Sequence, residues 1–415
     1  EKFLREQFHR NRPWSETVTK LISAEGREDE NGAANFLLAH LNNEAVPATA
    51  VTARVLLCEQ VQCTQCHNHP FVDWTQERFW QLNAFFQQTE IVRHRRTDPE
   101  TGRPMRDRLE LVSLDAGGPT FFEDRQARVQ VAYPEFEGVT VDDAPGVNRR
   151  QELAKLLCSG DQPQVARALV NRMWGKFFGY AFTDPIDDMG PHNRAVLPEL
   201  MDSLSSEFVR TGFDVKQLVR WICLSEPYQL AAATAAGNVV DDPETGNPPL
   251  FSRMYVKPLT AEQLFDSLLI ATQADRAGAR YWDEIETRRR VWLEQFYQAL
   301  DNDENSEEDS FEGSLAQTLV MMNGDLIRQA TAATPGTVLQ QVLSQATGEE
   351  EQIRLLSLAT LSRYPSADEL ASLKRVLRQQ VQSRPREVPA QVALHEGLRD
   401  LMWAYLNSTE FRSNL

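Results

Sequence analysis

The sequence predicts a mainly α-helical protein, with multi-helix domains and one small β-containing excursion near residues 105–135. Apolar residues recur at intervals of three and four along most of the chain, which is the spacing of one helix face. Residues that cap helices stand before several of these segments. Only two short runs, residues 108–113 and 127–133, alternate apolar and polar side chains as strands do.

The first part of the chain carries several helix signals. Residues 15–25 form a short amphipathic segment that Gly26 closes, and residues 34–42 form another. Pro47 stands where a helix can start. Thr75 can cap a helix whose apolar face follows it.

Helical signals resume at residues 150–178, after the β-like runs. A further helix is expected to end at Gly212, and Asp214 can cap the next one. Two capping boxes then mark helix starts, because a hydroxyl residue is followed three positions later by Glu or Gln. These pairs are Thr260 with Gln263 and Ser366 with Glu369.

We expect four segments along the chain. Residues 1–95 form a helical, cytochrome-like region that holds a short Cys/His motif, and residues 96–149 form the β-containing excursion. Residues 150–235 form a second helical region. A linker rich in Gly, Pro, Asp and Asn separates it from a C-terminal helical region, residues 251–415.

The net charge and the apolar content of the chain limit the kinds of partner that we expect it to bind. The 415 residues carry a net charge of −17, and an acidic surface argues against binding nucleic acid or anionic lipid. It suits a cationic redox partner, and it is equally consistent with a surface that only confers solubility. No run of 18 or more apolar residues appears, so we expect no transmembrane segment.

Five residues, Cys63-Thr64-Gln65-Cys66-His67, point to specific chemistry. The pattern C-x-x-C-H is that of covalent haem c attachment. The two thiols add to the vinyl groups of the haem, and the adjacent His becomes an axial ligand of the iron. The motif predicts haem c on Cys63 and Cys66, with His67 as the proximal ligand.

An electron-transfer haem of the low-spin type needs a sixth ligand. His69 is too close in sequence to the proximal histidine to reach the opposite face. His40 is the first candidate, because its helix precedes the motif and can fold across it. His94, His192 and Met189 are further candidates. Without a sixth ligand, an open iron would permit peroxidase or ligand-sensing chemistry.

The same cluster also fits two other uses. Cys63, Cys66 and either His67 or His69 supply three zinc ligands, and Cys58 can complete a tetrahedron. Alternatively, the two motif cysteines form a disulfide or remain free thiols. In these cases the protein would be a structural or interaction protein, and the cluster a zinc or disulfide staple.

A second group of polar residues lies in the stretch TDPIDDMGPHN. Asp184, Asp187, Asp188 and His192 can bind a divalent cation or perform acid–base chemistry, which would make the protein a hydrolytic enzyme. The simpler interpretation is structural, because Asp side chains commonly bond to nearby backbone amides in loops.

The stretch around the motif also resembles a known family. It reads VQCTQCHNHPFVDWTQERFWQLNAFF and is similar to the planctomycete cytochrome-like domain known as domain of unknown function 1549. Later stretches resemble its usual companion, domain of unknown function 1553. They are RALVNRMWGKFFGYAFTDPIDDMGPHN, FSRMYVKPLTAEQLFDSLL, FEGSLAQTLVMMNGDLI, LATLSRYPSADEL and WAYLNSTEF.

The resemblance implies a secreted protein of a family that often accompanies cytochrome c domains and has no established activity. Cys63, Cys66 and His67 correspond directly to the family's C-x-x-C-H motif. The family's flanking pattern is matched as well, by His69, Pro70 and Trp74. Cys58 departs from it, since the family more often has Gly there, and this places a third thiol near the motif.

Together these observations predict an exported haem c protein that transfers electrons, located in the periplasm or outside the cell. Because a single haem cannot pass electrons over a long distance, we expect a redox partner protein or self-assembly. The chain begins at Glu1 without Met or a signal peptide, so we expect it to be processed or incomplete.

Overall fold

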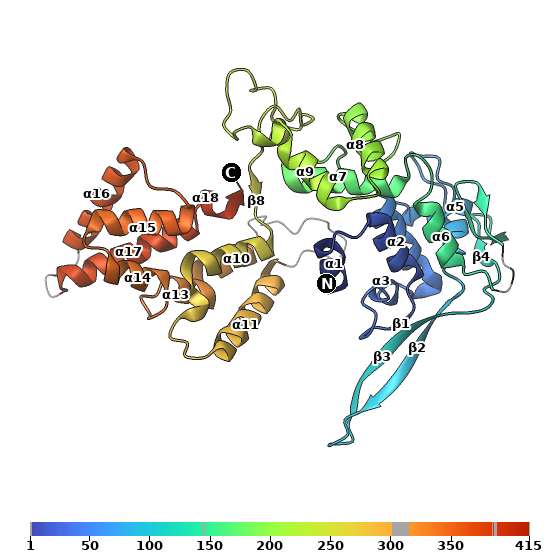
Figure 1. The fold of residues 1–415 in the computed structure, drawn as a ribbon, viewed down its shortest axis with the longest axis horizontal. Helices are drawn as coiled ribbons and strands as arrows, with labels where there is room; N and C mark the ends of the chain where they lie inside the picture. The colour runs from blue at the N-terminus through green and yellow to red at the C-terminus, as the bar shows by residue number, and fades with distance from the viewer. Residues whose placement is uncertain are drawn as a thin grey trace. The chain divides into compact units, whose positions relative to one another are not determined.

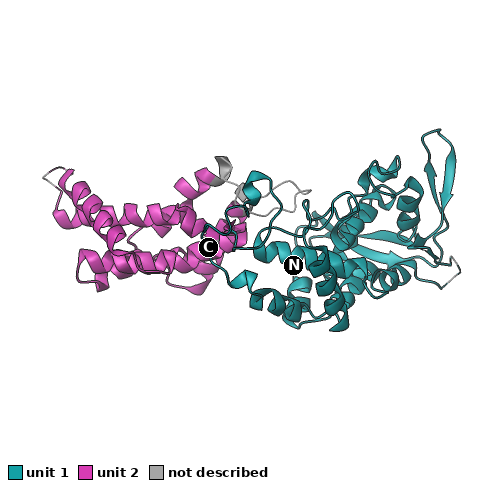
Figure 2. Ribbon diagram, turned by 90° about the horizontal axis from the view of Figure 1, so that it is seen from above, with its two compact units in different colours: residues 1–255 teal, residues 256–415 magenta. Residues whose placement is uncertain are grey.

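The structure is a computed structural model that describes residues 2–300, apart from 143 and 145, and residues 315–414, apart from 384, 386 and 387. The chain divides into two compact units, residues 1–255 and residues 256–415 (Figure 1, Figure 2). The expected segments 1–95, 96–149 and 150–235 all lie within the first unit.

Unit 1 is built mainly from helices. They are α1 (Lys2–His9), α2 (Trp14–Ser23), α3 (Asn35–Leu38), α4 (Val46–Thr52), α5 (Gln76–Asn83), α6 (Arg149–Leu157), α7 (Gln164–Phe178), α8 (Pro198–Arg210) and α9 (Val215–Leu224). Two of the predicted caps are confirmed. The Thr75 hydroxyl accepts the Arg78 N–H at the start of α5, and the Asp214 carboxylate accepts the Gln217 N–H in α9.

Three small antiparallel sheets make up the β-containing part of unit 1. They pair β1 (Gly26–Arg27) and β2 (Thr89–Thr97) with β3 (Pro104–Ser113), β4 (Thr120–Glu123) with β5 (Val129–Ala132), and β6 (Glu135–Phe136) with β7 (Val139–Thr140). A mainly α fold with a small β excursion is therefore confirmed. The excursion begins earlier than expected, because charged residues occupy both faces of outer β2 and hide the strand pattern.

Buried arginines join α6 to the end of α2 and to the loop before β4. At the start of α6, Arg150 donates to the carbonyls of Ile22 and Ala24 at 3.0 and 2.6 Å. Its neighbour Arg149 donates to the Gly118 carbonyl at 2.6 Å. Burial lowers the pKa of Arg150 to about 10, so the guanidinium remains charged at neutral pH.

In its described residues, unit 2 is a helical bundle closed by one short strand pair. Its helices are α10 (Ala261–Thr272), α11 (Trp282–Leu300), α12 (Leu315–Asn323), α13 (Asp325–Ala330), α14 (Val338–Gln345), α15 (Glu349–Leu361), α16 (Ala367–Ser383), α17 (Ala390–Leu406) and α18 (Thr409–Arg412). The pair is β8 (Lys257–Pro258) with β9 (Ser413–Asn414), which brings the two ends of the unit together. The capping box of Thr260 and Gln263 is confirmed.

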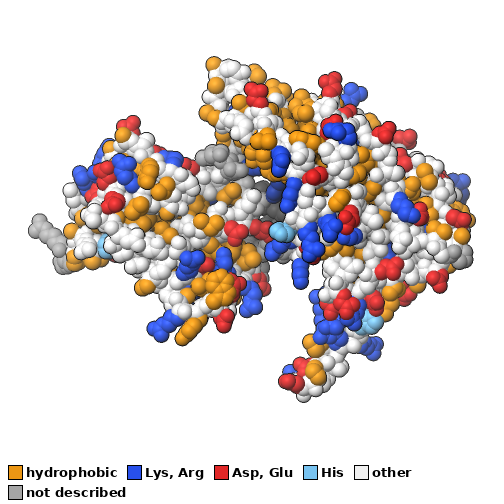
Figure 3. Space-filling model, viewed as in Figure 1, with side chains coloured by type: hydrophobic (Ala, Val, Ile, Leu, Met, Phe, Trp, Pro, Cys, Tyr) orange, Lys and Arg blue, Asp and Glu red, His pale blue; other side chains and the backbone are white. Residues whose placement is uncertain are grey.

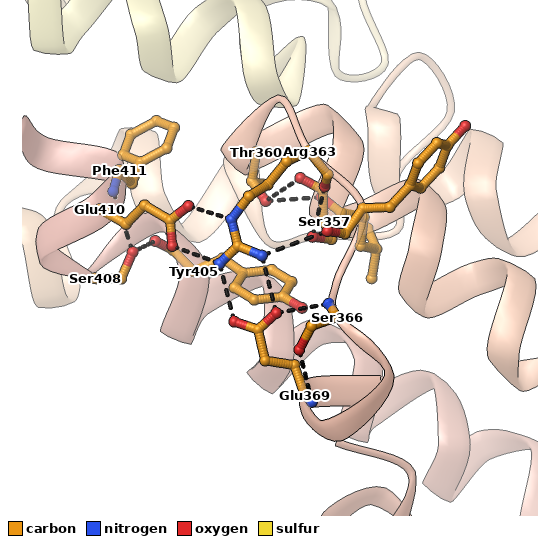
Figure 4. A network of polar contacts seen from close by, with 11 residues as sticks. Ser357, Thr360, Arg363, Ser366, Glu369, Tyr405, Ser408, Glu410 and Phe411 are labelled. Atoms are coloured by element: carbon orange, nitrogen blue, oxygen red, sulfur yellow. Dashed lines mark hydrogen bonds and ion pairs between the residues drawn. The ribbon is translucent and has the colours of Figure 1, made fainter. Parts of the chain in front are cut away.

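An ion-paired cluster around Arg363 joins three elements of unit 2 (Figure 4). Arg363 follows α15 and makes two bonds to Glu410 of α18, at 2.5 and 2.8 Å. It makes two more to Glu369 of α16, both at 2.9 Å. Glu369 also accepts the Ser366 N–H at 2.7 Å, as the capping box predicts. These bonds lower the pKa of Glu369 to about 2.

The described part of the chain holds no helix that could span a membrane. None of its helices combines the length and the apolar character that crossing a bilayer requires.

Candidate functional site

The C-x-x-C-H motif begins on a single helical turn, η3 (Gln62–Gln65), between α4 and α5, and Cys66 and His67 follow directly after it. Hydrogen bonds of Thr64 and Gln65 fix this turn to the core of the unit. Thr64 is buried, and its hydroxyl donates to the Val61 carbonyl at 2.5 Å. The Gln65 carbonyl accepts bonds from Gln76 and Trp80 of α5, each at 3.1 Å. With Thr64 directed inward, the two motif cysteines and His67 lie at the surface.

Both motif cysteines are free thiols exposed to solvent. Partial burial still raises the pKa of Cys63, so its thiol stays protonated at neutral pH. Among the described residues no cysteine forms a disulfide. Cys58 is buried, and its Sγ lies 3.9 Å from the Ala168 carbonyl in the core. The third thiol expected beside the motif is therefore not presented with Cys63 and Cys66.

His67 is held in one tautomer by its neighbour. Its Nδ1 lies 2.8 Å from the Asn68 carbonyl oxygen. Because a carbonyl can only accept, Nδ1 must carry the proton and donate it. Nε2 then has a free lone pair on an exposed ring. Metal-binding histidines are commonly oriented in this way, through a bond from the other ring nitrogen.

The other predicted ligands are placed differently. His69 accepts two backbone N–H groups at Nδ1, both at 3.2 Å, so its proton is on Nε2. His40 donates from Nδ1 to the Phe36 carbonyl at 2.7 Å and has the same tautomer as His67. Its role as sixth ligand stays a prediction. His94 lies on β2, where Nε2 is 2.6 Å from a Glu110 oxygen.

The structure brings the second sequence motif, residues 183–193, against the residues that flank the first motif on both sides. The side-chain amide of Gln60 donates to Asp187 at 2.7 Å, and the Met189 N–H donates to the Cys58 carbonyl at 2.6 Å. Asp187 is buried, and its bond to Gln60 connects the two loops. The two stretches, separated by more than a hundred residues, therefore form one surface junction.

His192 sits at this junction. Its Nε2 lies 2.9 Å from Asp188 Oδ2, and its ring centroid lies 6.0 Å from that of His69 and 6.3 Å from that of Phe71. Nδ1 faces Gly190, where a Cβ would come within 2.9 Å of it. This packing leaves little room for a ligand at Nδ1. The geometry thus gives the Asp188–His192 pair a role in shaping the loop.

A buried asparagine holds the 183–193 loop to α7. The Asn171 amide donates to the Thr183 hydroxyl and to the Ile186 carbonyl, both at 2.9 Å. Its oxygen accepts the Phe182 N–H, also at 2.9 Å. One side chain therefore fixes the loop that packs against the Cys/His motif.

Glu59 has a buried carboxylate oxygen, which the sequence does not predict. Its Oε2 atom is inaccessible to water and has no hydrogen-bond partner among the described residues. Burial is the main cause that raises the pKa of Glu59 to about 7, while the charge of Arg78 lowers it and those of Glu137 and Asp188 raise it further. An ordinary Glu after an apolar run carries no signal of such burial.

The aromatic residues around the motif are mostly core. Trp74, Phe79, Trp80 and Phe86 are buried, whereas Phe71 has 75% of its surface exposed. Among the described residues, no group of three or more His, Cys, Asp or Glu side chains is arranged to hold a metal ion. The junction thus offers accessible thiols and one imidazole, without a preformed zinc ligand set in the described part.

Comparisons with known families agree with the motif stretches. Residues 1–91 match the PSCyt2 family, described as a protein of unknown function (DUF1549), and residues 149–377 match the PSD1 family, described as a protein of unknown function (DUF1553). The expected family order is confirmed. Neither the curated proteins nor the solved structures gave a match. The chain belongs to the PSD1 family of proteins of unknown function (DUF1553), preceded by a PSCyt2 (DUF1549) region.

Proposed function

We propose that the chain is an exported haem c protein that transfers electrons, with haem bonded to Cys63 and Cys66 and with His67 as an axial ligand. One observation carries the proposal: two free, accessible thiols and a ligand-competent imidazole lie on one exposed turn. A periplasmic or extracellular location follows, because haem c is assembled outside the bacterial cytoplasm.

The residues of the motif fit the group they would hold. Each thiol would add across a vinyl group, which forms a thioether and requires a reduced, accessible sulfur, as both cysteines have here. Asn68 would keep the His67 ring oriented with Nε2 toward the iron. When bound, haem supplies reversible one-electron chemistry. Among the nearby aromatic side chains that the structure describes, Phe71 is the exposed one, and its ring stacks on His192.

The test is the intact mass of the protein after export in a bacterium with active cytochrome c maturation. Wild type should gain the mass of one haem, resistant to acid and organic solvent. The double variant Cys63→Ala/Cys66→Ala should carry none. Cys223→Ala is the matched control, because that residue lies on α9 outside the motif, and it should keep the haem. An unmodified wild type would overturn the proposal.

The sixth ligand can be tested in the same material. We propose His40, whose Nε2 bears the lone pair. His40→Ala should convert a six-coordinate spectrum to a five-coordinate one, whereas His94→Ala should leave it unchanged. A six-coordinate spectrum that survives His40→Ala would overturn the assignment.

The alternatives leave different signatures. A zinc staple on Cys63, Cys66 and His67 would give stoichiometric zinc by elemental analysis and no haem. A disulfide staple would give a mass lower by two hydrogens. A hydrolytic role for Asp187 and Asp188 has weaker support, because the buried Asp187 is already bonded to Gln60.

A further inference from the structure

The outer part of the β2–β3 hairpin, residues 93–108, is a basic arm. Near its base the hairpin packs on the core of unit 1 through Ile91, Leu109 and the fully buried Leu111. Beyond these residues it projects from the helices of the unit (Figure 1), and its side chains are mostly exposed. Blue side chains gather on it in the space-filling view (Figure 3).

The charge of the arm opposes that of the rest of the chain. Six arginines and three acidic residues give it a net charge of +3 within a chain of −17, so the remainder carries −20. The arm contains no lysine. Arginine presents a planar fork of donors that matches a carboxylate in a two-bond geometry, which is a feature of specific recognition.

Most of these arginines are not neutralised locally. Arg106 lies 3.3 Å from Glu28, and Arg108 lies 3.0 Å from Asp29, so two of the six have acidic neighbours. The other four form no ion pair with any residue that the structure describes. They are Arg93, Arg95, Arg96 and Arg103.

One of the three acidic residues of the arm, Asp98, is used within the arm itself. Asp98 accepts the backbone N–H groups of Glu100 and Thr101 at 2.8 and 2.9 Å, which shapes the turn at the tip. These bonds lower the pKa of Asp98, which therefore stays charged but is occupied with the turn. The free charge that the arm presents to a partner is therefore mainly positive.

Distance separates this charge from the acidic body. The five residues of β2 that belong to the arm, 93–97, span about 16 Å at the usual rise of a strand. The Debye length is about 8 Å at physiological ionic strength. The outer arginines can therefore attract an anionic partner beyond the range at which the body repels it.

The arm also offers open backbone edges. In the three-stranded sheet the strand order is β1-β3-β2, so β2 is an edge strand. On the other side, β1 covers β3 only opposite Leu111 and Glu110. An extended polypeptide can add to such an edge through backbone hydrogen bonds, a mode that nucleic acids cannot use.

We propose that the arm binds an acidic, extended segment of a partner protein, which adds as a strand along the free edge of β2. Its carboxylates pair with Arg93, Arg95 and Arg96. The arginines provide the charge complementarity, and the open edge restricts the partner to a polypeptide. This proposal is independent of haem at the Cys/His motif.

The test uses a labelled ten-residue peptide that alternates Glu and Thr, followed by fluorescence anisotropy at low ionic strength. Wild type should bind it, and binding should weaken as salt is added. Arg93→Glu/Arg95→Glu should weaken binding at least about tenfold. The matched control, Arg125→Glu/Arg375→Glu, makes the same change in net charge at exposed positions outside the arm and should bind as wild type does.

Two further probes sharpen the outcome. A peptide with N-methyl groups at alternate residues cannot pair with the edge and should bind more weakly than the parent. A short DNA duplex should bind more weakly than the peptide. Equal binding by the arm variant and wild type, equal binding of the N-methylated peptide, or tighter binding of the duplex would each overturn the proposal.

Discussion

The stretches that resemble the family serve different ends in the two units. In unit 2, residues 361–370 and 403–411 meet in the Arg363 cluster, where every charged group has a partner. In unit 1, residues 61–72 and 183–193 meet at the surface, where two thiols and the His67 Nε2 lie exposed. The family-like stretches of unit 2 therefore form an ion-paired contact between helices. Those of unit 1 leave two thiols and an imidazole exposed to solvent.

The largest effect should come from the buried support of the unit 1 junction. Asn171→Ala removes a fully buried amide and its bonds to the Thr183 hydroxyl, the Ile186 carbonyl and the Phe182 N–H. We expect the free energy of unfolding to fall by about 4 kcal/mol, measured by urea denaturation. Asn193→Ala, at a more exposed position of the same loop, should cost about 1 kcal/mol. Equal losses would show that Asn171 does not anchor the loop.

Glu59 should make stability depend on pH. Its pKa is about 7 in the folded protein and 4.5 ordinarily, so the folded state holds the proton more tightly. Wild type should then lose stability as pH rises from about 4.5 to about 7. Glu59→Gln should remove this loss and gain at most about 3 kcal/mol at pH 8, with no gain at pH 4. Thermal denaturation across pH measures it, and Glu199→Gln is the exposed control, because that residue is not among the groups that act on the pKa of Glu59. A gain at pH 4 that equals the gain at pH 8 would contradict the assignment.

The Arg363 cluster should respond less, because its side chains are partly exposed. Arg363→Met removes four charged hydrogen bonds that join α15, α16 and α18. We expect a loss of about 2 kcal/mol in the free energy of unfolding of unit 2. Arg354→Met breaks an ordinary surface pair with Glu350 and should cost less than about 0.5 kcal/mol. Indistinguishable losses would mean that the cluster does not lock the three elements.

The smallest effect on stability is expected at the motif itself. In protein that carries no haem, Cys63→Ala/Cys66→Ala should change the free energy of unfolding by less than about 0.5 kcal/mol, because both side chains are exposed. Urea denaturation measures it. A loss above about 2 kcal/mol would favour a zinc or disulfide staple.

The sequence predicted the local features well. Asp214, Thr260 with Gln263, and Ser366 with Glu369 lie where the structure has caps, because capping depends on neighbours three residues apart. The second role of Glu369, its bond to Arg363, was not predicted, since it depends on how α15 and α16 pack.

The junction in unit 1 was beyond prediction for a similar reason. The contact of Gln60 with Asp187 joins residues 127 positions apart and depends on the packing of α7. The residues of the motif itself were identified from their pattern alone, but their exposure and the tautomer of His67 required the structure.

The central claim is tested most directly by the reduced and oxidised visible spectra of the exported wild-type protein. We expect a sharp reduced α-band that is absent from Cys63→Ala/Cys66→Ala and altered in His67→Ala. A featureless spectrum in both redox states, from a host whose own c-type cytochromes mature normally, would contradict the haem assignment and leave the junction as a structural feature.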